Sequence, residues 1–159
     1  MRTFTLAVLF LLASAAGAED LDPAGSLARW IDATAGPELA EVLSRHPRFA
    51  GETAAFVAVV DGAPTEGSDR LHDAIERRLR RHVLRSEGVR LALPTHGDAC
   101  AAGARPELLV GIEIVPRGTR SASVSLGLID AVEGVWVSGV AHDWRGTLTT
   151  SERQALATP

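Results

Sequence analysis

Ala54-Ala-Phe-Val-Ala-Val-Val60 is a short apolar run, rich in β-branched residues, around which the rest of the chain is organised. Asp61-Gly62-Ala-Pro64 breaks the run, and a strongly periodic segment then extends from Ser68 to Ser86. Gly88 stops the periodic segment, and Val89-Arg-Leu-Ala-Leu93 has the composition of a second short strand. This succession predicts strand, loop, helix and strand, which together begin an α/β layer.

Segment 68–86 has the periodicity of an amphipathic helix. At 100° per residue, one stripe is expected to face the core: Leu71, Ile75, Leu79 and His82. The opposite stripe is charged and is expected to face solvent: Asp73, Glu76, Arg77, Arg80 and Arg81. Ser68 is the expected N-cap, and Leu84 lies off the apolar stripe, so we expect it to be exposed.

The N-terminus resembles a secretory signal peptide, with Met1-Arg2 as its positive region, an apolar stretch from Leu6 to Ala13, and the cleavage signal Ala16-Gly17-Ala18. Cleavage leaves residues 19–159 as a single α/β domain with its core in 54–142. No later apolar run reaches the ~18 residues of a membrane helix, so we expect no stable membrane span after cleavage. An uncleaved anchor is the alternative. The protein is therefore expected in the periplasm or outside the cell.

Charge and cysteine content exclude several classes of function. The chain has 16 basic and 20 acidic residues, and loss of Arg2 with the signal changes the net charge from −4 to −5. An acidic chain without tyrosine is a poor nucleic-acid binder, so Glu76-Arg-Arg-Leu-Arg-Arg81 is interpreted as a solvated helix face. Cys100 is the single cysteine, which leaves no intramolecular disulfide and no CxxC motif.

The remaining sequence predicts further helices and an antiparallel meander. Two N-terminal helices are expected, one capped by Ser26 and one restarted after an interruption at Gly36-Pro37 and ended by His46-Pro47. Segment 62–67 is expected to be a loop. Alternation predicts strands at 107–115, 121–129 and 135–142, after which Trp144-Arg-Gly146 leaves the sheet and a short helix follows. The predicted fold is therefore α+β, with one mixed sheet of about five strands and helices packed on it.

The large side chains near the last strand are the candidate partner-binding residues: Trp136, Trp144 and Arg145. Strict alternation places Trp136, Ser138, Val140 and His142 on one face of the strand, with Val135 and Val137 directed to the core on the other. Trp136 then lies on the polar side of the sheet, where it either packs under the N-terminal helices or anchors a partner.

Loop 94–106 brings together a base, a carboxylate and a thiol in His96, Asp98 and Cys100. Nucleophilic catalysis requires such groups, but partners in catalysis usually converge from distant segments, so no catalytic residue is assigned. His72 and Glu76 are four residues apart and His142 adjoins Asp143, yet neither pair forms a metal motif. We expect no metal and no cofactor.

Three features of the chain together resemble a known pattern. They are the apolar strand 54–60, the helix start Ser68-Asp69-Arg-Leu71, and a hairpin of Ser125-Leu-Gly-Leu-Ile-Asp130 with Gly134-Val-Trp136. The pattern is that of the periplasmic α/β domains of penicillin-binding-protein activator lipoproteins, curli-secretion lipoproteins and the N-terminal part of the TolB family. The resemblance covers residues 54–142; the chain lacks a lipobox cysteine, and residues 26–50 do not fit the pattern. It implies a non-catalytic accessory or docking role at the cell envelope and gives no site residue to transfer.

The leading hypothesis is a non-enzymatic exported interaction module of the bacterial envelope, whose partner is another envelope protein. The alternatives are a periplasmic enzyme that uses the 94–106 loop, and a small-ligand binder with its site between the sheet and the N-terminal helices. An enzyme requires a concave site around His96 and Cys100. An interaction module requires an exposed apolar patch or an open strand edge. The sequence leaves the oligomeric state open.

Overall fold

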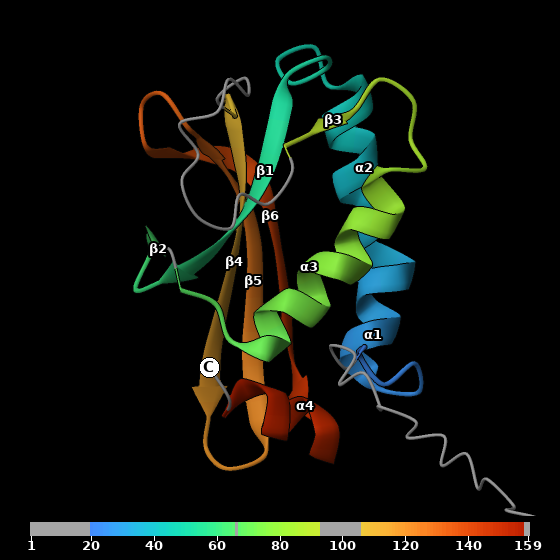
Figure 1. Cartoon of the computed structure of the whole chain (residues 1–159), viewed down its shortest axis with the longest axis vertical. Helices are drawn as coiled ribbons and strands as arrows, with labels where there is room; N and C mark the ends of the chain where they lie inside the picture. Colours follow the sequence, from blue (N-terminus) through green and yellow to red (C-terminus); the bar gives the residue numbers. More distant parts are fainter. Residues whose placement is uncertain (1–19, 66, 93–105, 158–159) are drawn as a thin grey trace, which may run out of the picture.

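The computed structural model describes residues 20–65, 67–92 and 106–157. Within them one open mixed sheet carries helices against one of its faces, which confirms the predicted α+β class (Figure 1). The sheet order is β2 (Ala63–Thr65), β1 (Thr53–Val60), β4 (Leu108–Arg117), β5 (Ser121–Asp130) and β6 (Val135–Thr147). The two-residue strand β3 (Arg90–Leu91) pairs with the start of β1, whereas β2 pairs with its end. The predicted signal segment 1–18 and the loop residues His96, Asp98 and Cys100 lie outside the described residues. In the described part of the chain, every helix is too short or too polar to cross a membrane.

The strands confirm a strand–helix–strand unit followed by a meander. β1 runs parallel to β3 and β4, whereas β1–β2, β4–β5 and β5–β6 are antiparallel.

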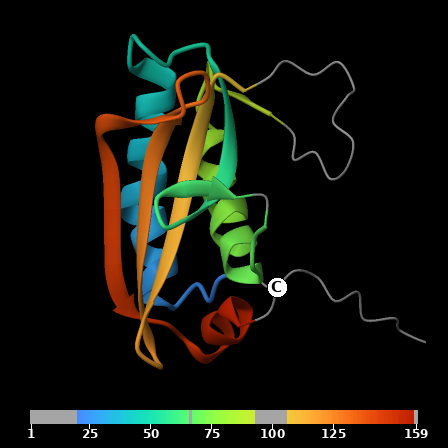
Figure 2. The ribbon, with the colours of Figure 1, turned by 90° about the vertical axis from the view of Figure 1, so that its left-hand side faces the viewer.

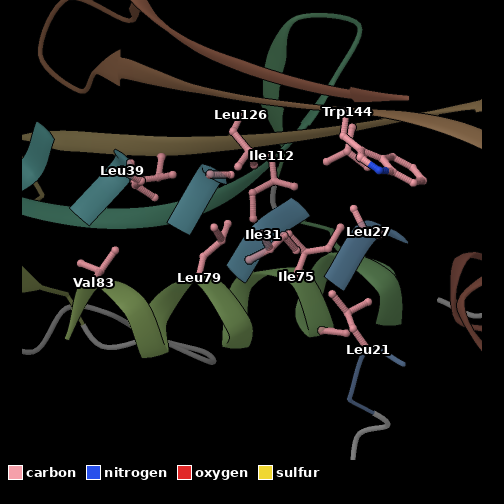
Figure 3. Packing of buried hydrophobic residues seen from close by; sticks show 14 of the residues in the cluster. Leu21, Leu27, Ile31, Leu39, Ile75, Leu79, Val83, Ile112, Leu126 and Trp144 are labelled. Atoms are coloured by element: carbon pink, nitrogen blue, oxygen red, sulfur yellow. The ribbon is translucent and has the colours of Figure 1, made fainter. Parts of the chain in front are cut away.

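The N-terminal helices and the helix over residues 70–83 form one layer against the sheet, and the C-terminal helix lies at the lower end of the molecule (Figure 2). Their bounds are α1 Ser26–Trp30, the π-helical segment η1 Ile31–Ala35, α2 Gly36–Arg45, α3 Arg70–Val83 and α4 Thr150–Leu156. Between this layer and the sheet lies the main core, in which side chains of the helices meet those of β4, β5 and β6 (Figure 3). The core includes the following fully buried side chains: Leu27, Ile31, Leu71, Ile75, Leu79, Val110, Ile112, Val124 and Leu128.

The prediction that Gly36-Pro37 interrupts the N-terminal helix was wrong, because α1, η1 and α2 follow one another without a break. Proline has no backbone N–H and so makes no hydrogen bond to the preceding turn. Here the preceding turn is the wide π-helical segment η1, which lets the helix continue without that hydrogen bond. Gly36 also faces the ring of His82 in α3, where a Cβ would lie 2.6 Å from Cδ2. Ser26 does not cap α1, since Gly25 occupies the N-cap position.

α3 confirms the predicted apolar stripe but not every detail of its ends and charged face. Its N-cap is Asp69 rather than Ser68, and the Asp69 carboxylate accepts a hydrogen bond from the His72 amide at 2.9 Å. Leu84 is 66% exposed, as expected. Arg80 is not on a solvated face, because its guanidinium donates to Glu76 and lies 5.1 Å from the centre of the Phe56 ring on β1.

Two parts of the sheet extend beyond the prediction. β2 lies in what was expected to be loop 62–67, because Asp61 and Gly62 both adopt positive φ and make a two-residue hairpin turn. β6 does not end at His142 but continues through Trp144 to Thr147, paired with β5. The sheet is therefore longer on the β6 side than the sequence pattern indicated.

We predict that Leu79→Ala lowers the free energy of unfolding by about 2–5 kcal/mol, because Leu79 is fully buried in the main core. Leu84→Ala removes the same atoms from an exposed site of the same segment and should change stability by less than about 0.5 kcal/mol. Urea denaturation followed by circular dichroism measures both. Equal midpoints would contradict the observed orientation of α3.

Asp32 joins η1 to α3 through two basic side chains. Its Oδ1 accepts from Nε of Arg78 at 2.9 Å and lies 3.0 Å from Nε2 of His82. The hydrogen bond from Arg78, followed by the interaction with His82, lowers the pKa of Asp32 from 3.8 to about 2 despite partial desolvation. A depressed folded-state pKa means that this carboxylate stabilises the fold above its unfolded pKa and ceases to do so as the pH falls towards 2.

We therefore expect Asp32→Asn to be destabilising at pH 7 and to lose its effect as the pH is lowered from about 4 to about 2. Urea midpoints of the variant and the parent at several pH values measure the difference. Glu87→Gln, at an exposed position beyond α3, is the control for removing one negative charge. A difference that persists unchanged at pH 2 would contradict the ionic role of Asp32.

Candidate functional site

The face of the sheet opposite the helical layer, here called the open face, is covered by no described helix, and the β1–β2 hairpin lies over part of it (Figure 2). In β1, β4 and β5, every second side chain points into the main core, and the side chains between them point to the open face. The central strands contribute mostly small or apolar residues to it: Ala55, Val57, Val59, Leu109, Gly111, Gly127 and Ile129.

Trp136 lies across this face at the start of β6. Gly111 and Gly127 are paired in the β4–β5 register, and the indole covers both. A Cβ on Gly127 would lie 2.5 Å from Cζ3 of the indole, and one on Gly111 would lie 2.9 Å from Cη2. Val59 and Ile129, which adjoin Gly111, are 1% exposed although they lie outside the main core. Trp136 and these neighbours therefore form a second, small apolar cluster.

The polar end of the indole is also held in place. Nε1 of Trp136 donates to the carbonyl of Gly62 at 3.1 Å, so that the β1–β2 turn is tied to β6 across the open face. Oε1 of Glu113, on β4, accepts from the amide of Gly62 at 3.0 Å. We call this arrangement the Trp136 platform; it consists of Val59, Gly62, Gly111, Glu113, Gly127, Ile129 and Trp136.

The Trp136 platform remains accessible. Trp136 is 44% exposed, and Val57 on β1 and Leu109 on β4 are partly exposed on the same face. Large exposed aromatic side chains beside aliphatic ones are typical of surfaces that bind other proteins. The platform is therefore the candidate functional site.

A β-bulge explains why the two tryptophans of β6 have different environments. Ile129 pairs with Trp136 and Gly127 pairs with Ala141, so an advance of two residues on β5 corresponds to five on β6. The odd difference reverses the alternation within β6.

The prediction that Trp136 shares a face with His142 was therefore wrong. Trp136 is on the open face, whereas Nδ1 of His142 lies 3.0 Å from Glu38 of α2, on the helical side. Val135, expected in the core, is 49% exposed.

Trp144 belongs to the main core, where its indole lies close to Leu27 and is 7% exposed (Figure 3). Its ring is thus not accessible to a partner in this structure. Arg145 is exposed and pairs in register with Ser123, whereas Asp143 accepts from the Ser125 hydroxyl at 2.7 Å. Partner binding by Trp136 and Arg145 stays a prediction.

The space proposed for a small ligand is filled. Core side chains occupy the interface between the sheet and the N-terminal helices, among them Leu27, Ile31 and Leu39. A cavity of about 130 Å³ lies instead between the β4–β5 turn and α4, well below the ~300 Å³ typical of ligand sites. Among the described residues, no three His, Cys, Asp or Glu side chains gather as a metal site would require.

Two signals in the sequence could have indicated the Trp136 platform. Asp61-Gly62 is the preferred dipeptide of a two-residue hairpin, and it would have predicted the turn that accepts the indole hydrogen bond. Gly111 interrupts an aliphatic strand, which commonly marks a close approach of another group. The bulge in β6 has no comparable signal, and Glu113 could not be assigned to Gly62 without the hairpin.

No protein-family model matches the chain, and no curated protein matches it either. Solved structures that are similar to the chain at low identity include the following three. The C-terminal domain of LpoB from Salmonella enterica is 10% identical with a TM-score of 0.45, covering 74% of this chain and 98% of that one. A DUF330 protein from Xanthomonas campestris is 12% identical with a TM-score of 0.35, covering 69% of this chain and 79% of that one. A PelC dodecamer from Paraburkholderia phytofirmans is 17% identical with a TM-score of 0.30, covering 68% of this chain and 82% of that one.

We predict that Trp136→Ala lowers the free energy of unfolding by about 1.5–3 kcal/mol, roughly half the cost of removing a fully buried tryptophan, because the ring is 44% exposed. Trp136→Phe retains most of the packing but loses the hydrogen bond to Gly62, which is worth about 1 kcal/mol. Chemical denaturation measures both. A Trp136→Ala variant as stable as its parent would show that the indole does not cover the open face in solution.

Proposed function

We propose that this chain is a non-enzymatic, exported interaction module of the bacterial cell envelope, and that it docks another envelope protein on the Trp136 platform. The observation that carries the proposal is the indole of Trp136, which is 44% exposed yet fixed by its contacts with Gly111, Gly127 and Gly62. Export and the envelope location rest on the signal-like segment at residues 1–18.

A fixed aromatic side chain suits binding because little conformational freedom is lost when the partner arrives. The two glycines set the plane of the indole and the Gly62 carbonyl sets its direction, so one ring face is presented in a single orientation. Val57 and Leu109, which are half-buried on the same face, extend the apolar area beyond the ring. Tryptophan in such a setting is among the residues that contribute most to protein–protein binding energy.

The charges on the open face supply a polar rim. Glu113, Asp143 and Arg145 occupy this face on β4 and β6, at positions that alternate with core residues. A polar rim around an apolar centre is the usual organisation of a protein–protein interface, and its charges select the partner more than they add affinity. Arg145 therefore keeps a role in partner choice, whereas the buried Trp144 supports the strand from the core side.

The experiment uses a photo-crosslinking amino acid at Leu109, which pairs with Ile129 on the open face, in the protein expressed in its own envelope. The same amino acid at Leu84 is the matched control, because Leu84 is exposed on the helical side of the molecule. We expect a specific adduct with one envelope protein from position 109 and none from position 84. Equal adducts from both positions would indicate contact without a docking face.

The identified partner is then titrated in purified form by calorimetry. Trp136→Ala should weaken binding by about 30-fold, which corresponds to about 2 kcal/mol for a central aromatic anchor. Leu84→Ala should leave the dissociation constant unchanged, and circular dichroism confirms that both variants are folded. Unchanged affinity of a folded Trp136→Ala variant would exclude the Trp136 platform as the docking site.

A further inference from the structure

The two edges of the sheet differ in their protection against pairing with another strand. The edge formed by β2 is three residues long and contains Pro64, and short strands with proline resist further pairing. The opposite edge is β6, which has thirteen residues and no proline. Among the described strands β6 pairs with β5 alone, and in Figure 2 it forms the outline of the molecule with no described element beyond it.

Beyond the bulge, β6 is regular. Residues 141–147 pair one by one with residues 121–127 of β5, from Gly127–Ala141 to Ser121–Thr147. A regular edge of this length presents backbone N–H and C=O groups at the spacing that an added antiparallel strand requires. The helices contact the inner side of this strand through α1 and leave its outer side clear in Figure 2.

The charges on this edge are self-complementary. Asp143 and Arg145 flank Trp144, both are exposed, and both lie on the open face. If a second β6 pairs antiparallel about a two-fold axis at Trp144, each residue faces the one equally distant on the other side of Trp144. Asp143 of each copy then lies opposite Arg145 of the other, which forms two ion pairs. No other symmetric register places these opposite charges together.

We propose that two copies of this chain pair along residues 141–147 of β6 about a two-fold axis at Trp144, which joins their sheets into one. Antiparallel pairing of identical edges is isologous, so the contact closes with two copies. Such an axis is perpendicular to the sheet and places both open faces on the same side. The two Trp136 platforms are then presented together, although the pairing itself does not depend on what the platforms bind.

The test is sedimentation equilibrium of the exported protein under reducing conditions, so that Cys100 cannot link two chains. The parent protein should be a dimer whose dissociation constant rises with salt, because the ion pairs are exposed. Asp143→Arg and Arg145→Asp each convert two attractive pairs into repulsive ones and should raise the dissociation constant roughly tenfold or more. The double variant Asp143→Arg/Arg145→Asp restores both pairs in exchanged positions and should dimerise like the parent.

A mixture of the two single variants gives the most specific result. In the mixed dimer, the two arginines of one chain face the two aspartates of the other, so the mixture should form heterodimers although neither variant dimerises well alone. Arg85→Asp is the charge-matched control on an exposed site after α3 and should leave the dimer intact.

The outcomes that overturn the proposal are equally specific. A parent protein that stays monomeric at its highest soluble concentration would exclude the pairing and leave the β6 edge for an extended segment of a different protein. A dimer that is insensitive to both single changes, or one that the double change and the mixture do not restore, would place the contact elsewhere on the molecule.

Discussion

The packing of a single helical layer against one face of the sheet is the constraint on which the rest of the structure depends. Ile75 and Leu79 of α3 pack with Ile31 of the N-terminal helix and with the sheet residues Ile112 and Leu126 (Figure 3). Burial of these side chains supplies the main stabilisation of the fold. Because no described helix covers the second face of the sheet (Figure 2), that face has to be stabilised by other means.

Trp136 supplies part of that stabilisation on the open face. The indole of Trp136 covers the middle strands on the face that has no helices, and the paired glycines beneath it allow the ring to lie close to the backbone. Such an arrangement removes Val59 and Ile129 from water without hiding the ring itself. The same contacts that stabilise the sheet therefore hold an exposed aromatic surface in one orientation, and this links folding to the proposed docking role.

The sequence predicted most elements of the fold but only part of the candidate site. The period-3.6 pattern through Leu71, Ile75 and Leu79 and the alternation in β4 and β5 are local signals that burial enforces, so these predictions were confirmed. The continuous helix through Pro37 and the position of Arg80 depend on neighbouring elements, which local periodicity does not describe. Trp136 was singled out, but its glycine platform requires knowledge of which strands are paired.

The bulge in β6 has a consequence for comparing this chain with distant relatives. Strand alternation is the feature by which β-strands are usually matched when sequence identity is low. Between Trp136 and Ala141 that alternation changes phase, so a gap-free match that follows the pattern from Trp144 backwards would assign Trp136 to the helical side. A relative that lacks the extra residues could keep every hydrophobic position of the meander and still present no aromatic ring on the open face.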